Sequence, residues 1–181
     1  MADNNKKMEQ ILIRITGQDQ PGLTASFTSI LSKYDAQVLD IGQADIHSTL
    51  SLGLLIRIDE EHSGQVMKEA LFKATELGVN VGFSPISSEE YEDWVNRQGK
   101  NRYILMVLGR SLSARNIAAA TSIITKQGMN IDGIRRLTGR MSLKHPENNV
   151  RACIEFSLRG EPKNHSEMQA AFMKLSNEMA I

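Results

Sequence analysis

The chain carries one pattern twice, and this internal repeat constrains its fold more than any other feature. Residues 10–41 and 103–134 align at a single offset (121 − 28 = 93), at which Thr28-Ser29-Ile30 matches Thr121-Ser122-Ile123. The two stretches also share the same order of strand-like and helix-like segments. A period of this kind indicates two copies of one supersecondary unit. We therefore expect two similar domains in tandem.

The first copy predicts the element order βαββαβ. Ile11, Ile13 and Ile15 recur at every second position, as in a strand, and Pro21-Gly22 then opens a segment with helical apolar spacing. The expected elements are a strand at 11–16, a helix at 23–34, strands at 37–47 and 50–58, a helix after Ser63 and a strand at 79–83. The second helix is expected to bury Val66, Met67, Ala70, Leu71, Ala74 and Leu77. This order is typical of the ferredoxin-like fold.

The second copy repeats the order but stops early. Its expected elements are a strand at 102–108, a helix from about Ser113, a strand at 130–137, a long hairpin through Gly139 and Pro146, a strand at 150–159 and a helix reaching Met179. No fourth strand follows. The predicted fold class is α+β, with two ferredoxin-like βαββαβ units in tandem and the second unit lacking its last strand.

The repeat divides the chain into three segments. We expect a first domain at 9–85, a polar linker with one helical turn at 86–99, and a second domain at 100–181. Because a missing strand leaves backbone groups unpaired, we expect the chain to be a fragment cut where the eighth strand would begin. Two alternatives stay open: a partner chain supplies the strand, or the sheet has three strands.

Composition excludes several classes of protein. The 181 residues include 41% hydrophobic side chains, enough for a packed core, yet no apolar run approaches the ~18 residues that span a membrane. The polar N-terminus lacks the apolar segment of a secretory signal. Since Cys153 is the only cysteine, no intrachain disulfide can form, which favours a cytoplasmic location.

Charge is divided between the two halves of the chain. Residues 1–92 contain 7 Lys/Arg and 14 Asp/Glu, a net charge of −7, and residues 93–181 contain the reverse, a net charge of +7. This excludes a uniformly basic surface for nucleic acid. It leaves two interpretations: a basic half that meets nucleic acid, or two oppositely charged lobes that attract each other or a partner chain.

No catalytic or metal-binding constellation is visible. The histidines are separate from one another, without a second ligand at metal spacing: His47, His62, His145 and His165. Glu60-Glu61-His62 is interpreted as charge at the start of a helix, and Cys153 as a packing residue on a strand. We therefore predict no catalysis by this chain and no metal or cofactor bound to it.

The segment from Gly17 to Thr24 is the strongest candidate for a ligand site. It joins the first strand to the first helix, and a helix start presents free N–H groups and partial positive charge to a carboxylate. Gly22 allows a ligand close to the backbone, and Asp19 can accept hydrogen bonds from an ammonium group. These features fit the head of a free amino acid. The alternative is a helix start with Asp19 as its cap.

A basic hairpin is the second candidate. Arg135, Arg136 and Arg140 lie close together, followed by Lys144 and His145, and could meet phosphates. The hairpin has no aromatic residue for stacking on bases, so a solvated hairpin or a contact with the acidic half is the alternative interpretation.

The motif Asp-x-Pro-Gly-Leu at Asp19–Leu23, inside a βαββαβ unit, resembles an ACT domain. More closely, residues 17–24, 39–58 and 134–145 are similar to the N-terminal regulatory region of bacterial SerB-type phosphoserine phosphatases, especially those of Bacteroidetes. The resemblance covers nearly the whole chain. It implies that a magnesium-dependent phosphatase domain of the haloacid-dehalogenase type follows in the parent protein, in the serine biosynthesis pathway.

The resemblance also implies a role for this chain. ACT domains pair through strands or helices and hold amino acids at the loop after the first strand, so we expect a homodimer that binds L-serine. The residues that match the family motif are Asp19, Pro21, Gly22, Leu23 and Thr24. The second copy departs from it, with Ser111 to Arg115 in the equivalent place, which puts a second site in doubt. The alternative function is a free-standing tandem-ACT regulator resembling the glycine cleavage transcriptional repressor.

Overall fold

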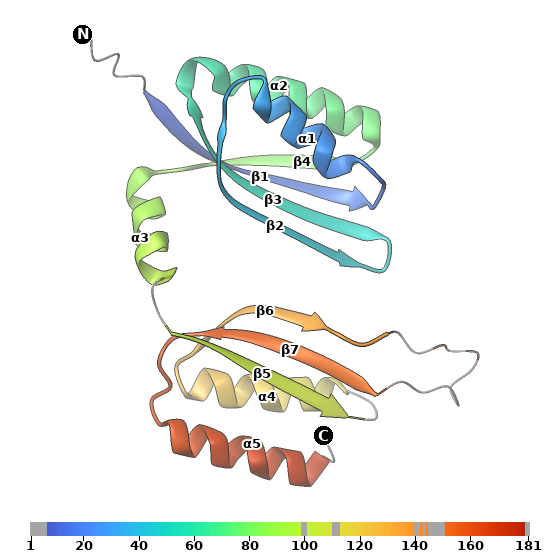
Figure 1. Cartoon of the computed structure of the whole chain (residues 1–181), viewed down its shortest axis with the longest axis vertical. Helices are drawn as coiled ribbons and strands as arrows, with labels where there is room; N and C mark the ends of the chain where they lie inside the picture. The colour runs from blue at the N-terminus through green and yellow to red at the C-terminus, as the bar shows by residue number, and fades with distance from the viewer. Residues whose placement is uncertain are drawn as a thin grey trace. The chain divides into compact units, whose positions relative to one another are not determined.

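The computed structural model describes residues 7–98, 101–109, 113–139, 142, 144 and 151–179. The chain divides into two compact units, one ending at Trp94 and the other beginning at Val95. In each unit an antiparallel sheet is covered on one face by two helices (Figure 1). The α+β class and the two-unit architecture are therefore as predicted.

The first unit has the complete βαββαβ order. Its elements are β1 (Met8–Gln18), α1 (Leu23–Ser32), β2 (Gln37–Ile46), β3 (Thr49–Asp59), α2 (Glu60–Leu77) and β4 (Asn80–Ile86). The strand order is β2-β3-β1-β4, so β1 lies inside the sheet between β3 and β4. β4 runs through Pro85, which an edge strand tolerates because its outward side needs no N–H donor.

Alternation in β1 and β3 builds the core of the first unit. Ile13 lies opposite Leu54, and both side chains are almost fully buried beneath the helices. Leu12 and Leu55 face each other on the opposite side of the sheet, where both are half-buried and line a pocket together with Tyr91 and Trp94. Removing the apolar side chains from water, at about 25 cal/mol per Å², drives this arrangement.

Helix α2 differs from its prediction at two points. It begins at Glu60, before Ser63, because Asp59 caps it by accepting a 3.0 Å hydrogen bond from the Glu61 N–H. Leu71 was predicted to be buried but is 51% exposed. The buried stripe follows Ser63, Val66, Ala70 and Ala74, and the 100° turn per residue carries Leu71 off its edge.

The predicted linker is mostly helix rather than a single helical turn. Residues Ser88–Gln98 form α3, three turns long. Ser87 and Glu90 make a reciprocal capping box: the Ser87 N–H donates to Glu90 Oε2 at 2.8 Å, and the Glu90 N–H donates to Ser87 Oγ at 3.1 Å. Acidic residues in its first turn and Arg97 in its last favour the same helix through its dipole.

The second unit contains β5 (Arg102–Gly109), α4 (Ala114–Lys126), β6 (Asn130–Arg136), β7 (Ala152–Arg159) and α5 (His165–Met179). Its strand order is β5-β7-β6, and within the described ranges no strand pairs with the second edge of β5. Cys153 is buried on β7, in line with a packing role. Part of the predicted hairpin between β6 and β7, including Arg140, His145 and Pro146, lies outside the described residues.

Candidate functional site

The loop between β1 and α1 forms one wall of a pocket of about 410 Å³. The five residues predicted from the motif all line it. The full lining is Asp19, Gln20, Pro21, Gly22, Leu23, Thr24, Ala25 and Gln43. The structure thus brings every predicted site residue to one small pocket, of a size that suits a small molecule.

Helix α1 begins without a side-chain cap. Its N-cap residue is Gly22, in the left-handed region at φ 85°, and no side chain accepts a hydrogen bond from the first turn. A Cβ at Gly22 would meet no atom within 4 Å, so the backbone there is open to an approaching molecule. The partial positive charge of the helix start is therefore directed at the pocket.

Asp19 does not cap α1, which removes the alternative interpretation of this residue. Its backbone N–H donates to the Ser48 carbonyl at 2.8 Å and fixes the loop to the β2–β3 turn. Its side chain is exposed at the pocket and makes no hydrogen bond within the described part of the chain. An acceptor carboxylate and an uncapped helix start thus line the same pocket.

Two contacts hold the loop against the α2–β4 connection. Gln20 Nε2 donates to the Leu77 carbonyl at 2.8 Å. Gly17 lies so close to Val79 that a Cβ at residue 17 would be 2.7 Å from Val79 Cγ1 and 3.1 Å from its Cα. The pocket therefore rests on a packed part of the fold, although the loop itself is on the surface.

Gln43 was not predicted to belong to the site. It lies on β2 opposite Leu52, which faces the helices, and Thr24 Oγ1 donates to its Oε1 at 2.7 Å. Because alternate residues of a strand share one face, the sequence could have placed Gln43 on the same side of the sheet as Ile41, the side that the helices cover. Its position beside α1, however, depends on the pairing of β2 with β3, which the sequence does not reveal.

The corresponding helix start in the second unit is capped by a side chain. Ser113 is the N-cap of α4, and its Oγ accepts a 3.3 Å hydrogen bond from the Asn116 N–H. Ser111 and Leu112 lie outside the described residues. The first turn of α4 therefore offers less to a carboxylate ligand than the first turn of α1 does.

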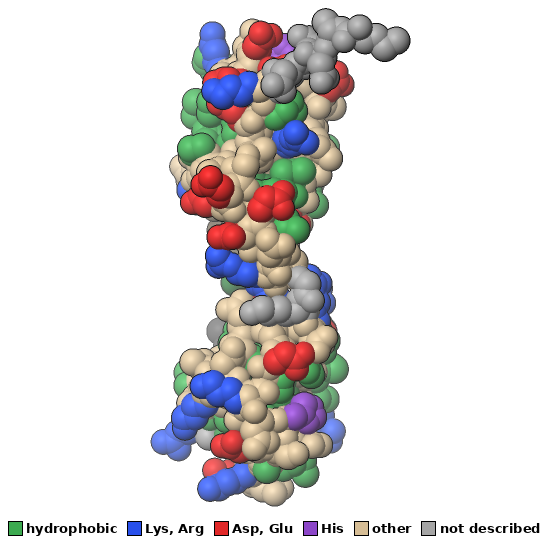
Figure 2. Space-filling model, turned by 90° about the vertical axis from the view of Figure 1, so that its left-hand side faces the viewer, with side chains coloured by type: hydrophobic (Ala, Val, Ile, Leu, Met, Phe, Trp, Pro, Cys, Tyr) green, Lys and Arg blue, Asp and Glu red, His purple; other side chains and the backbone are tan. Residues whose placement is uncertain are grey.

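The described arginines of the basic hairpin, Arg135 and Arg136, bond to residues of their own unit. Arg135 pairs with Glu155 on β7 at 3.0 Å, and Arg136 donates to the carbonyls of Thr138 and Gly139. Among the described residues no three His, Cys, Asp or Glu side chains are placed to hold a metal ion. On the face of the first unit that Figure 2 shows, acidic side chains are interspersed with basic ones.

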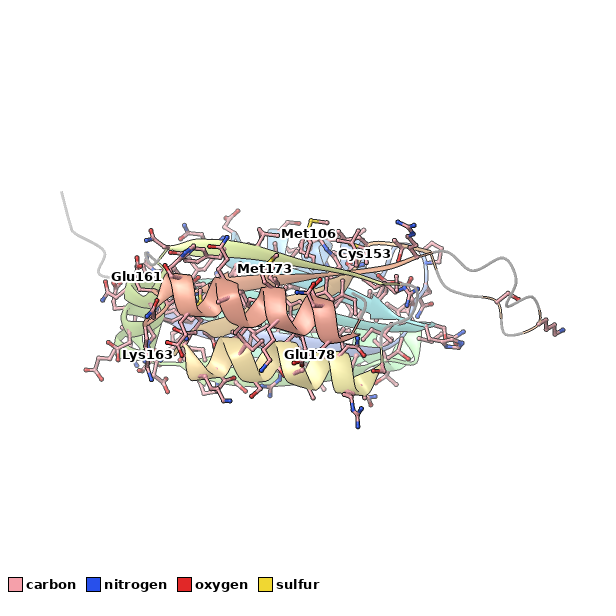
Figure 3. The ribbon with its side chains drawn as sticks, turned by 90° about the horizontal axis from the view of Figure 1, so that it is seen from below. Met106, Cys153, Glu161, Lys163, Met173 and Glu178 are labelled. Atoms are coloured by element: carbon pink, nitrogen blue, oxygen red, sulfur yellow. The ribbon has the colours of Figure 1, made fainter. Side chains whose placement is uncertain are left out.

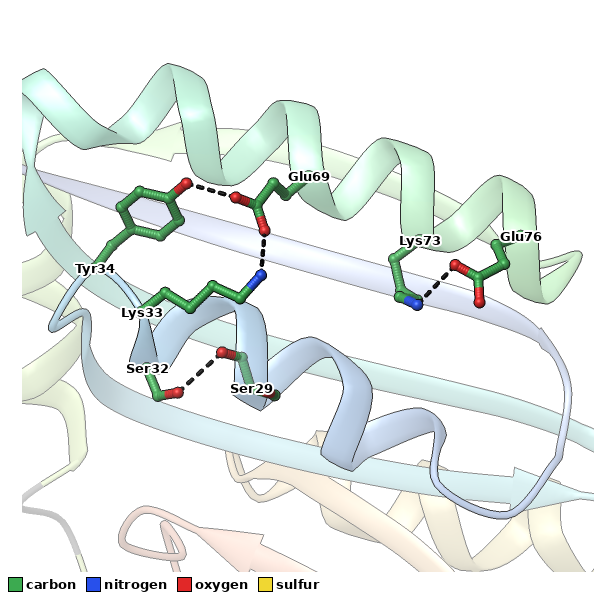
Figure 4. A network of polar contacts seen from close by, with 7 residues as sticks. All are labelled: Ser29, Ser32, Lys33, Tyr34, Glu69, Lys73 and Glu76. Carbon is green, nitrogen blue, oxygen red and sulfur yellow. Dashed lines mark hydrogen bonds and ion pairs between the residues drawn. The ribbon is translucent and has the colours of Figure 1, made fainter.

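A polar network joins the two helices of the first unit (Figure 4). Glu69 on α2 accepts hydrogen bonds from Lys33 Nζ at 2.7 Å and from Tyr34 Oη at 2.5 Å. The bond from Lys33, and then that from Tyr34, lowers the pKa of Glu69 below its usual value. The bond to Glu69 in turn raises the pKa of Tyr34. The network holds the end of α1 against α2, and none of its residues lines the pocket.

Comparison with known proteins identifies the fold of the first unit. The family model described as "ACT domain" matches residues 9–84. The UPF0237 protein MK1213 of Methanopyrus kandleri is 32% identical over 76 residues, which are 41% of this chain and 84% of that protein. The chain belongs to the ACT-domain family.

Two curated phosphoserine phosphatases match a longer stretch of this ACT protein. SerB2 of Mycobacterium tuberculosis is 27% identical over 130 residues, covering 71% of this chain and 31% of SerB2. The phosphoserine phosphatase of Streptomyces coelicolor is 27% identical over 166 residues, covering 88% of this chain and 36% of the enzyme. The chain thus spans about a third of the length of these relatives and resembles the ACT regulatory region of SerB.

Solved structures share the tandem architecture. A protein of unknown function from Galdieria sulphuraria gives a TM-score of 0.72 at 16% identity, covering 96% of this chain and 95% of that one. A candidate glycine cleavage system transcriptional repressor gives 0.64 at 12% identity, covering 96% and 93%. At these identities the likeness establishes the fold of the ACT units and nothing further. Within the described ranges no helix is both long and apolar enough to cross a membrane.

Proposed function

We propose that the first ACT unit binds a free amino acid at the α1 loop, that this amino acid is L-serine, and that binding regulates a phosphoserine phosphatase of which this chain is the sensing region. The observation that carries the proposal is the pairing, in one pocket, of an uncapped helix start with the unbonded carboxylate of Asp19. The helix start would receive the carboxylate of the amino acid, and Asp19 its ammonium group.

The choice of serine rests on the relatives. Two curated proteins that match most of this chain are phosphoserine phosphatases, and serine is the product that such an enzyme releases. Thr24 and Gln43 supply a hydroxyl and an amide at the pocket wall, which suit a small hydroxyl-bearing side chain. In this proposal any magnesium belongs to the phosphatase domain of the parent protein, and the protein acts in the cytoplasm.

We further propose that the chain acts as a homodimer. Nearly all of β2 is exposed, and its outer edge pairs with no strand among the described residues, so a second copy can add to it. If serine favours one arrangement of the dimer, the coupling between the two events is about 1–3 kcal/mol. Sedimentation equilibrium with and without serine measures this coupling directly.

Calorimetric titration tests the serine site. We expect L-serine to bind the chain and Asp19→Asn to weaken binding about 10- to 100-fold, because a hydrogen bond to a charged group contributes about 1.5–3 kcal/mol. The matched control is Asp35→Asn, beyond the other end of α1, where a positive φ of 48° suits Asn. No heat of binding with any small amino acid, or equal affinity in both variants, would contradict the proposal.

A free-standing regulator is the second candidate function. It is favoured by the structural likeness to the candidate repressor, which extends over almost the full length of both chains. The two candidates differ in what the parent gene encodes. A phosphatase domain in the same reading frame supports the enzyme, whereas a stop codon directly after this chain, together with capture of a second regulator, supports the alternative.

A further inference from the structure

A second pocket of the first unit lies on the face of the sheet opposite α1 and α2. Its volume is about 280 Å³, and it is lined by Leu12, Asp40, Leu55, Ile86, Glu90, Tyr91 and Trp94. None of these residues lines the pocket at the α1 loop. A ligand in this second pocket is therefore independent of the proposed serine site.

Helix α3 forms the aromatic wall of this pocket. Ser88 Oγ, in the first turn of the helix, donates to Gln10 Oε1 on β1 at 3.4 Å and holds the helix start against the sheet. Tyr91 and Trp94 are three residues apart and so share one side of α3. Their ring centroids are 5.9 Å apart, with the ring planes tilted by 37°. The pocket thus has two half-buried aromatic rings on one side.

The charged side chains of the pocket are both carboxylates. They belong to Asp40 and Glu90, and no Lys, Arg or His lines the pocket. Each accepts one hydrogen bond from a nearby backbone N–H, at Ile41 and at Ser87, and neither forms an ion pair within the described part of the chain. Two negative charges beside apolar and aromatic side chains thus have no compensating cation among the described residues.

The equivalent face of the second unit differs in its described part. There α4 and α5 lie side by side on one face of the sheet (Figure 3), and β5 turns Ile104, Met106 and Leu108 to the opposite face. Glu155, an acidic residue on that face opposite Met106, pairs with Arg135 at 3.0 Å. The acid on this face is therefore compensated by a basic side chain of the same sheet, unlike the two acids of the first unit.

We propose that the pocket of the first unit binds a small alkylammonium ion. The charge of the ion lies between the two aromatic rings and the two carboxylates, and its alkyl groups pack on Leu12 and Leu55. A cation is attracted to the face of an aromatic ring when it lies within about 6 Å of the ring centre. The net charge of −7 on residues 1–92 attracts a cation to this unit as well.

Other classes of ligand fit this pocket less well. The two carboxylates repel an anion. A calcium or magnesium ion takes ~6 or more oxygen ligands, and the leucine and isoleucine side chains of the pocket offer it none. A neutral apolar molecule would leave both carboxylates uncompensated. An organic cation satisfies the apolar floor, the rings and the carboxylates together.

The fluorescence of Trp94 tests the proposal, because Trp94 is the only tryptophan of the chain and lines this pocket. Choline is titrated into the full chain. The matched ligand is the neutral carbon isostere of choline, in which a carbon atom replaces the nitrogen. We expect a saturable change in Trp94 emission with choline, and binding about tenfold weaker for the isostere, which has the same shape without the charge.

Substitutions locate the binding in the pocket. Asp40→Asn and Glu90→Gln keep an acceptor for the backbone N–H groups and remove the charges, so together they should weaken choline binding about fivefold or more. Tyr91→Leu keeps an apolar wall without the ring and should weaken it about threefold. The controls, Asp45→Asn on β2 and Glu89→Gln on α3, lie outside the pocket and should leave choline binding unchanged.

Three results would overturn the proposal: no saturable change with choline, an equal response to the neutral isostere, or unchanged affinity without the two carboxylates. So would an equal loss of choline binding in the control variants, because binding would then follow the charge of the whole unit. The comparison of the two ligands uses the unmodified chain, so it is decisive even if a variant does not fold.

Discussion

Thr24 on α1 donates a 2.7 Å hydrogen bond to Gln43 on β2, across the pocket at the start of the helix. The bond joins a residue of the predicted motif to one that the motif does not contain. It ties the helix start to the edge strand, two elements that both line the pocket.

A double-mutant cycle measures this link. Thr24→Val and Gln43→Leu should each lower the free energy of unfolding, with a coupling of about 0.5–1 kcal/mol, as for a surface hydrogen bond. Urea denaturation of the four proteins gives the value. Thr28→Val is the control, since Thr28 Oγ1 bonds only to carbonyls of its own helix, at Thr24 and Ala25, and should show no coupling with Gln43.

Gly22 has a conformational role and a proposed role in binding, and two variants can distinguish them. Gly22→Ala should cost about 1 kcal/mol of stability because φ is 85°, and should also weaken amino-acid binding because the new methyl group enters the pocket. Gly78→Ala has a comparable φ of 65° and equally open surroundings at the end of α2. It should show the stability loss alone. Equal binding by the two variants in calorimetry would argue against a ligand at Gly22.

Gly17 is required for close packing beneath the loop. A methyl group at this position would lie 2.7 Å from Val79 Cγ1 and 3.1 Å from the Val79 Cα, so Gly17→Ala should destabilise the first unit by about 1–3 kcal/mol. Adding Val79→Ala should restore only part of the loss, because the backbone contact stays. Thermal unfolding of the single and double variants provides the comparison, and full rescue would place the clash in the side chain alone.

The Glu69 network predicts a pH dependence. The folded-state pKa of Glu69 is lowered from 4.5, so its contribution to stability is present above that pH and is lost as the pH falls through the folded-state value. Glu69→Gln should therefore be less stable than the parent near pH 7, and the difference should shrink below about pH 4.5. Thermal unfolding from pH 7 to pH 3 gives the two curves.

The same network also predicts a loss of stability at high pH. The pKa of Tyr34 is raised from 10.0, so its contribution is present below pH 10 and is lost as the pH rises through the folded-state value. Tyr34→Phe removes only this hydroxyl and should flatten the alkaline limb of the stability curve relative to the parent. Glu76→Gln, which breaks an exposed ion pair within one turn of α2, serves as the control and should leave both limbs unchanged in shape.

The sequence by itself determined those features that depend on neighbours along the chain. Alternation placed Ile11, Ile13 and Ile15 in the core, the repeat gave two units of the same order, and Pro21-Gly22 marked the start of α1. The residues of the α1 loop are consecutive, so their arrival at one pocket followed from a single local motif.

Only the tertiary structure decided what depends on pairing and packing between distant segments. β5 is apolar at nearly every position, so no alternation told which of its sides is buried. Packing with residues of α4 and α5 buries Val107, whereas Ile104, Met106 and Leu108 on the other side are half or more exposed. Gln43 joined the pocket through the register of β2 on β3. Local patterns report the side-chain period, whereas the order of strands in a sheet, and so which strand lies at its edge, depends on packing between segments that are far apart in the sequence.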